Sequence, residues 1–155
     1  MEKANFVPRL DNIICFVAYR TSLKMRQYRT ELFKANGYNV TSEQWRVLHR
    51  LWEEDGISQN EIARRLFKQD PSITRILDDL AKDGLIERKT ISKNRRRYNV
   101  FLTEKGKTLT VQLRVIAKEA VGKACQGIDK QEIDRAIDVL NKIYQNIEIA
   151  LADRG

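Results

Sequence analysis

The order of helix starts and β-prone runs between residues 41 and 102 constrains the fold more than any other feature. The segments T-S-E-Q at 41–44 and S-Q-N-E at 58–61 have the form of capping boxes, which open helices. Asp70 followed by proline predicts a third start with Asp70 at the N-cap, since aspartate accepts bonds from free first-turn amides and proline needs no amide partner there. Gly84 suits the left-handed C-terminal cap of that helix.

After Gly84 the pattern becomes extended. Residues 85–88 and 98–102 are β-prone runs around a polar, arginine-rich loop, which predicts a β-hairpin. Three short helices followed by a hairpin predict a winged helix-turn-helix, whose third helix enters the DNA major groove and whose hairpin is the wing. We therefore expect a mainly α fold with a small β-hairpin wing.

Long helices flank this module. Residues 10–35 contain no helix breaker, one helix begins at 103–105, and a D-K-Q-E box at 129–132 caps the last one. The apolar face of that last helix is wider than one small domain covers, which favours packing against a second copy over packing within the monomer. We expect an N-terminal dimerisation helix (1–36), a winged helix-turn-helix DNA-binding domain (37–106) and C-terminal dimerisation helices (107–155).

The net charge of +8 and the pI of about 9.6 favour a polyanionic partner. Residues 87–97 hold six Lys/Arg against one Glu, so the positive charge gathers in the middle of the chain. The longest apolar run, 13–19, is too short to span a membrane, and no secretory signal pattern is present, which predicts a cytoplasmic protein without membrane contact. Two cysteines and one histidine match no zinc-ligand set, and we expect neither a metal nor a cofactor.

Candidate DNA contacts lie on the third helix and the wing. Ser72, Thr74 and Arg75 lie opposite the helix's apolar side, where a recognition helix presents side chains to bases; the alternative is an ordinary solvated helix. We assign direct base contact, to guanine, to Arg75, whereas Ser72 and Thr74 either hold phosphates or read bases. In the wing an arginine at the tip can enter the minor groove. The predicted wing contacts are Lys93, Arg95, Arg96 and Arg97.

Residues 40–106, including the capping boxes and the N-R-R-R-Y segment, resemble the MarR family of bacterial transcriptional regulators. The resemblance implies an obligate homodimer, formed by the N- and C-terminal helices, that binds a pseudo-palindromic operator and usually represses a nearby operon. In the family's wing motif Asp-x-Arg-Ser/Thr, the aspartate braces the arginine that reaches the minor groove. Here Asn94 stands at the aspartate position, Arg96 at the arginine and Arg97 at the Ser/Thr.

Residues 10–28 resemble the first helix of the organic-hydroperoxide-sensing subgroup of this family. The resemblance implies that oxidation of Cys15 releases the DNA, as in a stress-response regulator. It also implies that Tyr28 is one of two tyrosines bonded to the thiol, with Ser42 in place of the other, and that Cys125 is a candidate resolving cysteine. The alternatives are that Cys15 is a small buried hydrophobe and that Cys125 is a helix-end residue without a redox role.

Other conspicuous residues receive structural interpretations. Trp45 and Trp52 are expected in the core, and the resemblance places a ligand pocket near enough for Trp45 to line it. The acidic clusters at 53–55 and 78–79 are expected to be solvated helix ends and faces.

The sequence thus predicts a sequence-specific DNA-binding transcriptional regulator. We expect a homodimeric repressor released from double-stranded operator DNA by a small aromatic ligand or by organic hydroperoxide acting on Cys15. The chain lacks a Walker loop, a dinucleotide-binding glycine motif and a nucleophile elbow, so we expect no enzyme. The alternatives are a thiol peroxidase centred on Cys15 and a winged helix used for protein contact.

Overall fold

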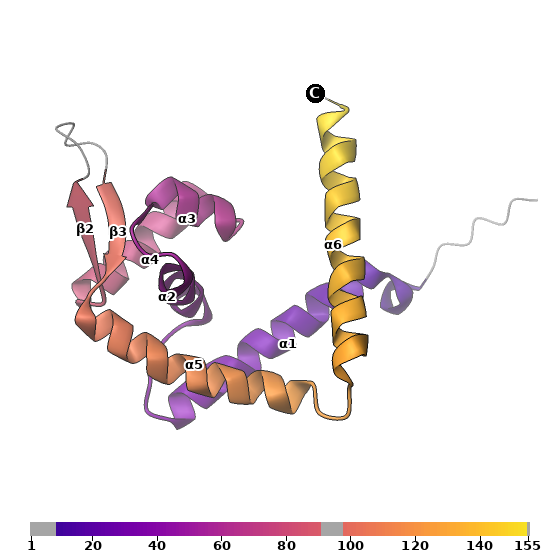
Figure 1. Ribbon diagram of the computed structural model, residues 1–155, viewed down its shortest axis with the longest axis horizontal. Coiled ribbons are helices and arrows are strands. Elements are labelled where there is room, and N and C mark those ends of the chain that lie inside the picture. The colour runs from indigo at the N-terminus through magenta and orange to yellow at the C-terminus, as the bar shows by residue number, and fades with distance from the viewer. Residues whose placement is uncertain (1–8, 91–97, 155) are drawn as a thin grey trace, which may run out of the picture. The chain divides into compact units, whose positions relative to one another are not determined.

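A computed structural model describes residues 9–90 and 98–154 of the chain (Figure 1). The chain up to Ala120 forms one compact unit, and Val121–Gly155 forms a second. In chain order, the elements are η1 (Leu10–Asn12), α1 (Ile14–Ala35), α2 (Ser42–Glu53), β1 (Ile57–Ser58), α3 (Gln59–Arg65), α4 (Asp70–Lys82), β2 (Ile86–Thr90), β3 (Tyr98–Leu102), α5 (Glu104–Ala124) and α6 (Lys130–Ala152). The predicted mainly helical winged helix-turn-helix is confirmed.

Local capping explains where several helices begin. The predicted capping box of α2 is complete, because the Thr41 hydroxyl accepts from the Gln44 amide at 3.1 Å and the Gln44 side chain accepts from the Thr41 amide at 3.0 Å. The box that opens α6 at Asp129 is also complete. At α3 only the Ser58 hydroxyl takes part, accepting from the amide of Glu61 at 3.2 Å.

Two predicted helix starts were wrong. Gln69, not Asp70, is the N-cap of α4, because the carbonyl of Gln69 already accepts from the amides of Ser72 and Ile73. The predicted unbroken N-terminal helix is interrupted at Ile13, whose φ of −88° and ψ of 115° are extended. A short 3-10 turn, η1, therefore precedes α1.

The wing strands belong to a three-stranded antiparallel sheet in the order β1-β3-β2. β3 lies in the centre, where Val100 pairs with Ile57 of β1 and with Arg88 of β2. The sequence did not predict β1, which is only two residues long. α4 contacts both β2 and α2, so the recognition helix and the wing pack on the same core (Figure 1).

The hydrophobic core lies in the first unit. Phe33 of α1, Leu48 and Leu51 of α2, Leu77 of α4 and Leu113 of α5 are fully buried. Burying each such side chain contributes roughly 1.5–3 kcal/mol. On α5 the last buried residue is Ala120, and none of the residues that the structure describes on α6 is buried. None of the helices within residues 9–90 and 98–154 contains an apolar stretch of the length that a membrane span requires.

Candidate functional site

The three side chains predicted to contact DNA from α4 are all exposed. Ser72, Thr74 and Arg75 project from the helix while Ile73 and Leu77 face the core with no exposed surface. This division agrees with the predicted recognition helix, although contact with DNA itself stays a prediction. α4 carries three aspartates against one arginine and one lysine. Most phosphate-binding charge must therefore come from elements around α4 rather than from α4 itself.

A hydrogen-bond chain joins α4 to the start of α3 and to the wing. The side-chain amide of Gln59 donates to the Thr74 hydroxyl at 2.7 Å, and the Tyr98 hydroxyl donates to Gln59 Oε1 at 2.9 Å. Thr74 thus has a structural partner besides any DNA contact. Sequence reasoning missed Gln59 and Tyr98, because they lie far apart in the chain and belong to no motif.

A second link joins α4 to strand β2. The Arg88 guanidinium donates to the Asp78 carboxylate at 2.6 Å and lies over the Tyr98 ring, 5.5 Å from its centroid. Asp78 is exposed, as predicted for the acidic clusters, and it also forms this ion pair. Asp55 is exposed as well, and its carboxylate accepts from the backbone amide of Leu102 at 2.9 Å. Both carboxylates fix the wing strands, since a charged acceptor strengthens a hydrogen bond.

The predicted wing contacts lie outside the described residues. These are Lys93, Arg95, Arg96 and Arg97, together with Asn94 at the family's aspartate position. Strands β2 and β3 on either side of them pair from Thr90 with Tyr98 to Ile86 with Leu102. The hairpin is therefore confirmed, and the roles of its arginines stay predictions.

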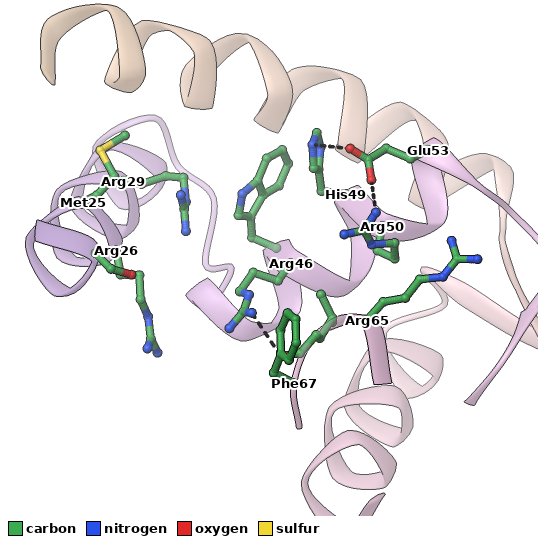
Figure 2. A pocket seen from close by; sticks show the side chains of 12 residues that line it. Met25, Arg26, Arg29, Arg46, His49, Arg50, Glu53, Arg65 and Phe67 are labelled. Carbon is green, nitrogen blue, oxygen red and sulfur yellow. Dashed lines mark hydrogen bonds and ion pairs between the residues drawn. The ribbon is translucent and has the colours of Figure 1, made fainter. Parts of the chain in front are cut away.

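A pocket of about 510 Å³ opens between α1, α2 and the end of α3 (Figure 2). Its volume lies within the range of small-molecule sites. It is lined by Ser22, Met25, Arg26, Arg29, Trp45, Arg46, His49, Arg50, Glu53, Arg65, Leu66 and Phe67.

The charge of this pocket is strongly uneven. Five arginines line it against a single carboxylate, that of Glu53. Glu53 is already engaged, because it accepts from Arg50 at 2.6 Å and lies 3.4 Å from His49, as the dashed lines in Figure 2 show. Arg65 is bound outside the pocket by Glu54 and Glu61. The remaining guanidinium groups therefore leave a net positive surface toward the cavity.

Arg29 is a partly buried member of this set. One of its terminal nitrogens donates to the Ser42 hydroxyl at 3.1 Å, while its Nε is buried without a hydrogen-bond partner among the described residues. Burial, followed by repulsion from Arg26 and Arg46, lowers the pKa of Arg29. Its guanidinium nevertheless stays charged at neutral pH. A partly buried, incompletely bonded cation favours an anionic ligand.

Aromatic groups form the floor of the pocket. Trp45 is only 5% exposed, as predicted, and its ring packs against His49 at a tilt of 31° with centroids 4.8 Å apart. Burial lowers the pKa of His49, and the nearby Arg114 and Arg50 add to this effect against the opposing influence of Glu53. His49 is therefore mainly neutral at pH 7. Trp52 was wrongly predicted as core: it is 39% exposed and packs under Arg114.

The candidate redox residues do not meet within the described chain. Cys15 is exposed near the start of α1, so within the single chain it is not a core residue. Tyr28 is thirteen residues further along the same helix, which at 1.5 Å per residue separates the two by about 20 Å. A Tyr28–Cys15 hydrogen bond would therefore need a second chain. Cys125 is partly exposed and belongs to the second unit.

Comparisons with known proteins agree with this architecture. The MarR family model matches residues 40–98, from the start of α2 to the wing. A MepR–DNA complex from S. aureus is 25% identical, with a TM-score of 0.75, and the match covers 85% of this chain and 96% of that one. A protein of unknown function from Listeria innocua is 32% identical, with a TM-score of 0.66, over 86% of this chain and 91% of that one.

A further match concerns the fold alone. CouR from Rhodococcus jostii RHA1, solved with p-coumaroyl-CoA bound, is 21% identical with a TM-score of 0.76 and matches 87% of this chain and 94% of that one. The family model covers α4 and strand β2 and ends at Tyr98, the first residue of β3, whereas these structural matches extend over the flanking helices as well. The chain belongs to the MarR family of DNA-binding transcriptional regulators.

Proposed function

We propose that this protein is a homodimeric repressor that releases its operator when a small anionic molecule occupies the pocket between α1 and α2. One observation carries the proposal. The pocket gathers five arginines around a single carboxylate, and the buried Nε of Arg29 has no partner among the described residues. Such a site carries a net positive charge that can bind an anion. The proposal includes the expected division into dimerisation helices at 1–36 and 107–155 around a DNA-binding domain at 37–106.

On the DNA side, α4 enters the major groove, where Arg75 contacts a base and Ser72 and Thr74 contact bases or phosphates. The wing arginines, Arg96 foremost, contact the minor groove and the phosphates beside it. A twofold dimer then reads a pseudo-palindrome whose half-sites have centres about one helical turn apart.

The dimer is supported by the exposed apolar side chains of α6. Ile137, Leu140, Tyr144, Ile147 and Leu151 are each at least 40% exposed in the chain. They recur at steps of three and four, so they form one stripe along the helix. A stripe of this length is usually covered by a partner, because exposed apolar patches of that size are uncommon in monomers.

The pocket also indicates the chemical class of the effector. Trp45 and His49 line the pocket with aromatic rings, and the arginines offer partners for carboxylate or phosphate groups. An aromatic anion satisfies both. The p-coumaroyl-CoA bound to CouR combines an aromatic ring with phosphates, and it is therefore a reasonable first compound to test.

Fluorescence anisotropy on an operator obtained by in vitro selection tests the proposal. Wild-type protein bound to the duplex is titrated with p-coumaroyl-CoA and with simple aromatic carboxylates. We expect at least one of them to release the DNA, and Arg29→Met to stay bound at the same concentrations. Arg20→Met is the matched control, since Arg20 lies on α1 in a surface ion pair with Asp11 outside this pocket. Equal release from wild type and Arg29→Met would contradict the proposal.

A parallel titration with an organic hydroperoxide distinguishes the redox alternative. If the wild type releases the DNA and Cys15→Ser stays bound, then the signal is thiol oxidation rather than ligand occupancy. The thiol peroxidase alternative is not favoured, because the family consists of transcriptional regulators. Multiple turnovers of hydroperoxide with an added thiol reductant would nevertheless support that alternative.

A further inference from the structure

Glu43, in the first turn of α2, binds cations from three parts of the first unit. Its carboxylate accepts a hydrogen bond from Arg26 of α1, lies 2.7 Å from the Lys68 ammonium and lies 3.7 Å from Arg46 of α2. Lys68 belongs to the turn between α3 and α4. The side chain of Glu43 is only 22% exposed. One partly buried carboxylate thus joins the N-terminal helix to the segment that leads into the recognition helix.

Charges around Glu43 are not balanced. A single carboxylate faces Arg26, Arg46 and Lys68. Burial acts to raise the pKa of Glu43, but the contact with Lys68 and the charges of Arg26 and Arg46 outweigh burial and lower it. Glu43 is therefore ionised at neutral pH. The surplus of positive charge means that a second anion nearby would meet cations that Glu43 only partly neutralises.

Two of these cations also line the arginine-rich pocket. Arg26 and Arg46 contact Glu43 on one side and the cavity on the other. An anion in the pocket and the carboxylate of Glu43 can therefore bind the same guanidinium groups. Glu43 itself does not line the cavity.

The same residues hold the turn before α4. Arg46 donates to the backbone carbonyl of Leu66 at 3.1 Å, and Lys68 is bound to Glu43. Between them Phe67 has a φ of 53°, in the left-handed region that bulky residues rarely adopt. Such a conformation persists where surrounding contacts fix it. The position of this turn thus depends on Arg46 and Glu43.

We infer that Glu43 is an internal counter-ion that holds the α3–α4 turn in place, and that an anion in the pocket competes with it for Arg26 and Arg46 and so loosens the turn. This inference rests on the proposed effector pocket. Glu43 is a positioning residue: it acts on DNA binding through Lys68 and the turn rather than through contact with DNA.

Substitution of Glu43 by glutamine removes the charge and keeps the shape. The pocket arginines then lose their competitor, so the affinity for pyrophosphate, the simplest polyanionic probe, should rise roughly fivefold or more. The turn loses its ionic anchor, so operator affinity should fall by a similar factor. If Glu43 had a purely structural role, the substitution would weaken both pyrophosphate binding and operator binding.

Hydrogen exchange measures the turn directly. The amides of Phe67 and Lys68 donate to the carbonyls of Arg64 and Ala63 at 3.3 and 3.0 Å, so they are protected while the turn is held. We expect exchange at both amides to speed up in Glu43→Gln, and in wild type with saturating pyrophosphate. Glu104→Gln removes a charge from an exposed i,i+3 pair with Lys107 on α5 and should change neither exchange rate.

The outcomes separate the inference from the proposed function. Unchanged exchange at the turn in Glu43→Gln would overturn the inference. Calorimetric binding of pyrophosphate to wild type without faster exchange would also overturn it, while leaving the effector pocket intact. If neither pyrophosphate nor p-coumaroyl-CoA binds to wild type or to Glu43→Gln, the proposed anionic effector fails, and the competition fails with it. Tighter pyrophosphate binding together with faster exchange would support the inference.

Discussion

The two units of this chain differ in how far their apolar side chains are exposed. On α4 the apolar residues Ile73, Leu77 and Leu80 are fully buried within the chain. On α6 the apolar residues Leu140, Tyr144 and their neighbours along the helix are exposed, although both helices are amphipathic. The difference teaches that amphipathic periodicity predicts a covered face but not what covers it. For α4 the cover is the chain itself, and for α6 we propose a second copy.

The largest effect is expected where the cover is internal. Leu77→Ala in α4 should lower the free energy of unfolding by about 2–5 kcal/mol, because it leaves a cavity in a closely packed core. Chemical denaturation followed by circular dichroism measures this loss, and we expect it to be the same at low and high protein concentration. A loss that grew with dilution would show that α4 also depends on a partner.

A substitution on the apolar face of α6 should weaken dimerisation rather than the folding of the monomer. Ile147→Asp places a carboxylate on the apolar stripe, and burying it unpaired in a dimer interface should weaken dimerisation at least about 100-fold. Sedimentation velocity measures the change, and far-ultraviolet circular dichroism checks that the first unit stays folded. Lys142→Asp, at an exposed polar position of the same helix, is the control. A wild type that sediments as a monomer would refute the proposed interface.

A glycine-to-alanine substitution near each end of α5 tests the same difference between a packed region and an exposed one. A Cβ on Gly106 would lie 1.9 Å from the backbone carbonyl oxygen of Leu85, so Gly106→Ala should destabilise the protein by about 1–3 kcal/mol. A Cβ on Gly122 meets no described atom within 4 Å, so Gly122→Ala should stabilise the helix by roughly 0.5–1 kcal/mol. Thermal denaturation compares the two. The same sign for both would contradict the packing difference.

A smaller effect is expected at acid pH, where protonation of Glu61 should lower the stability of the first unit. The hydrogen bonds from Arg64 and then Arg65 lower the pKa of Glu61 from 4.5 to about 2. A depressed pKa gives stability that is present above the unfolded value and is lost as the pH falls from about 4.5 toward 2. Glu61→Gln should therefore show a shallower loss of stability over this window. Parallel pH profiles for the two proteins would disprove this role.

How much the sequence could predict depended on the range of the interactions. The capping boxes of α2 and α6, the buried face of α4 and the hairpin were predictable, because each depends on residues close in the chain. Strand β1 was not, since two residues such as Ile57 and Ser58 carry no periodic signal and pair only with the distant β3. The N-cap of α4 was misplaced by one residue, because backbone bonding at Gln69 overrode the better capping side chain in sequence.

The arginine-rich pocket was also beyond sequence reasoning, apart from Trp45. Arg26 and Arg29 on α1, and Arg46 and Arg50 on α2, repeat at steps of three and four, which in either helix alone indicates an ordinary solvated face. Only the packing of α1 against α2 brings the two sets together around one cavity. A helical repeat of arginines on two neighbouring helices is the signal that could have found it.

The small strand β1 has a mechanical consequence. It runs directly into α3 and pairs with β3, and the Asn99 side chain donates to the Gly56 carbonyl at 2.6 Å beside it. The base of the wing is thereby joined to the start of α3. The α3–α4 turn lies beyond this joint, so an effector that loosens the turn would change where α4 lies relative to the wing and leave the base of the wing in place. The recognition helix and the wing would then no longer fit the major groove and the minor groove of one half-site at the same time.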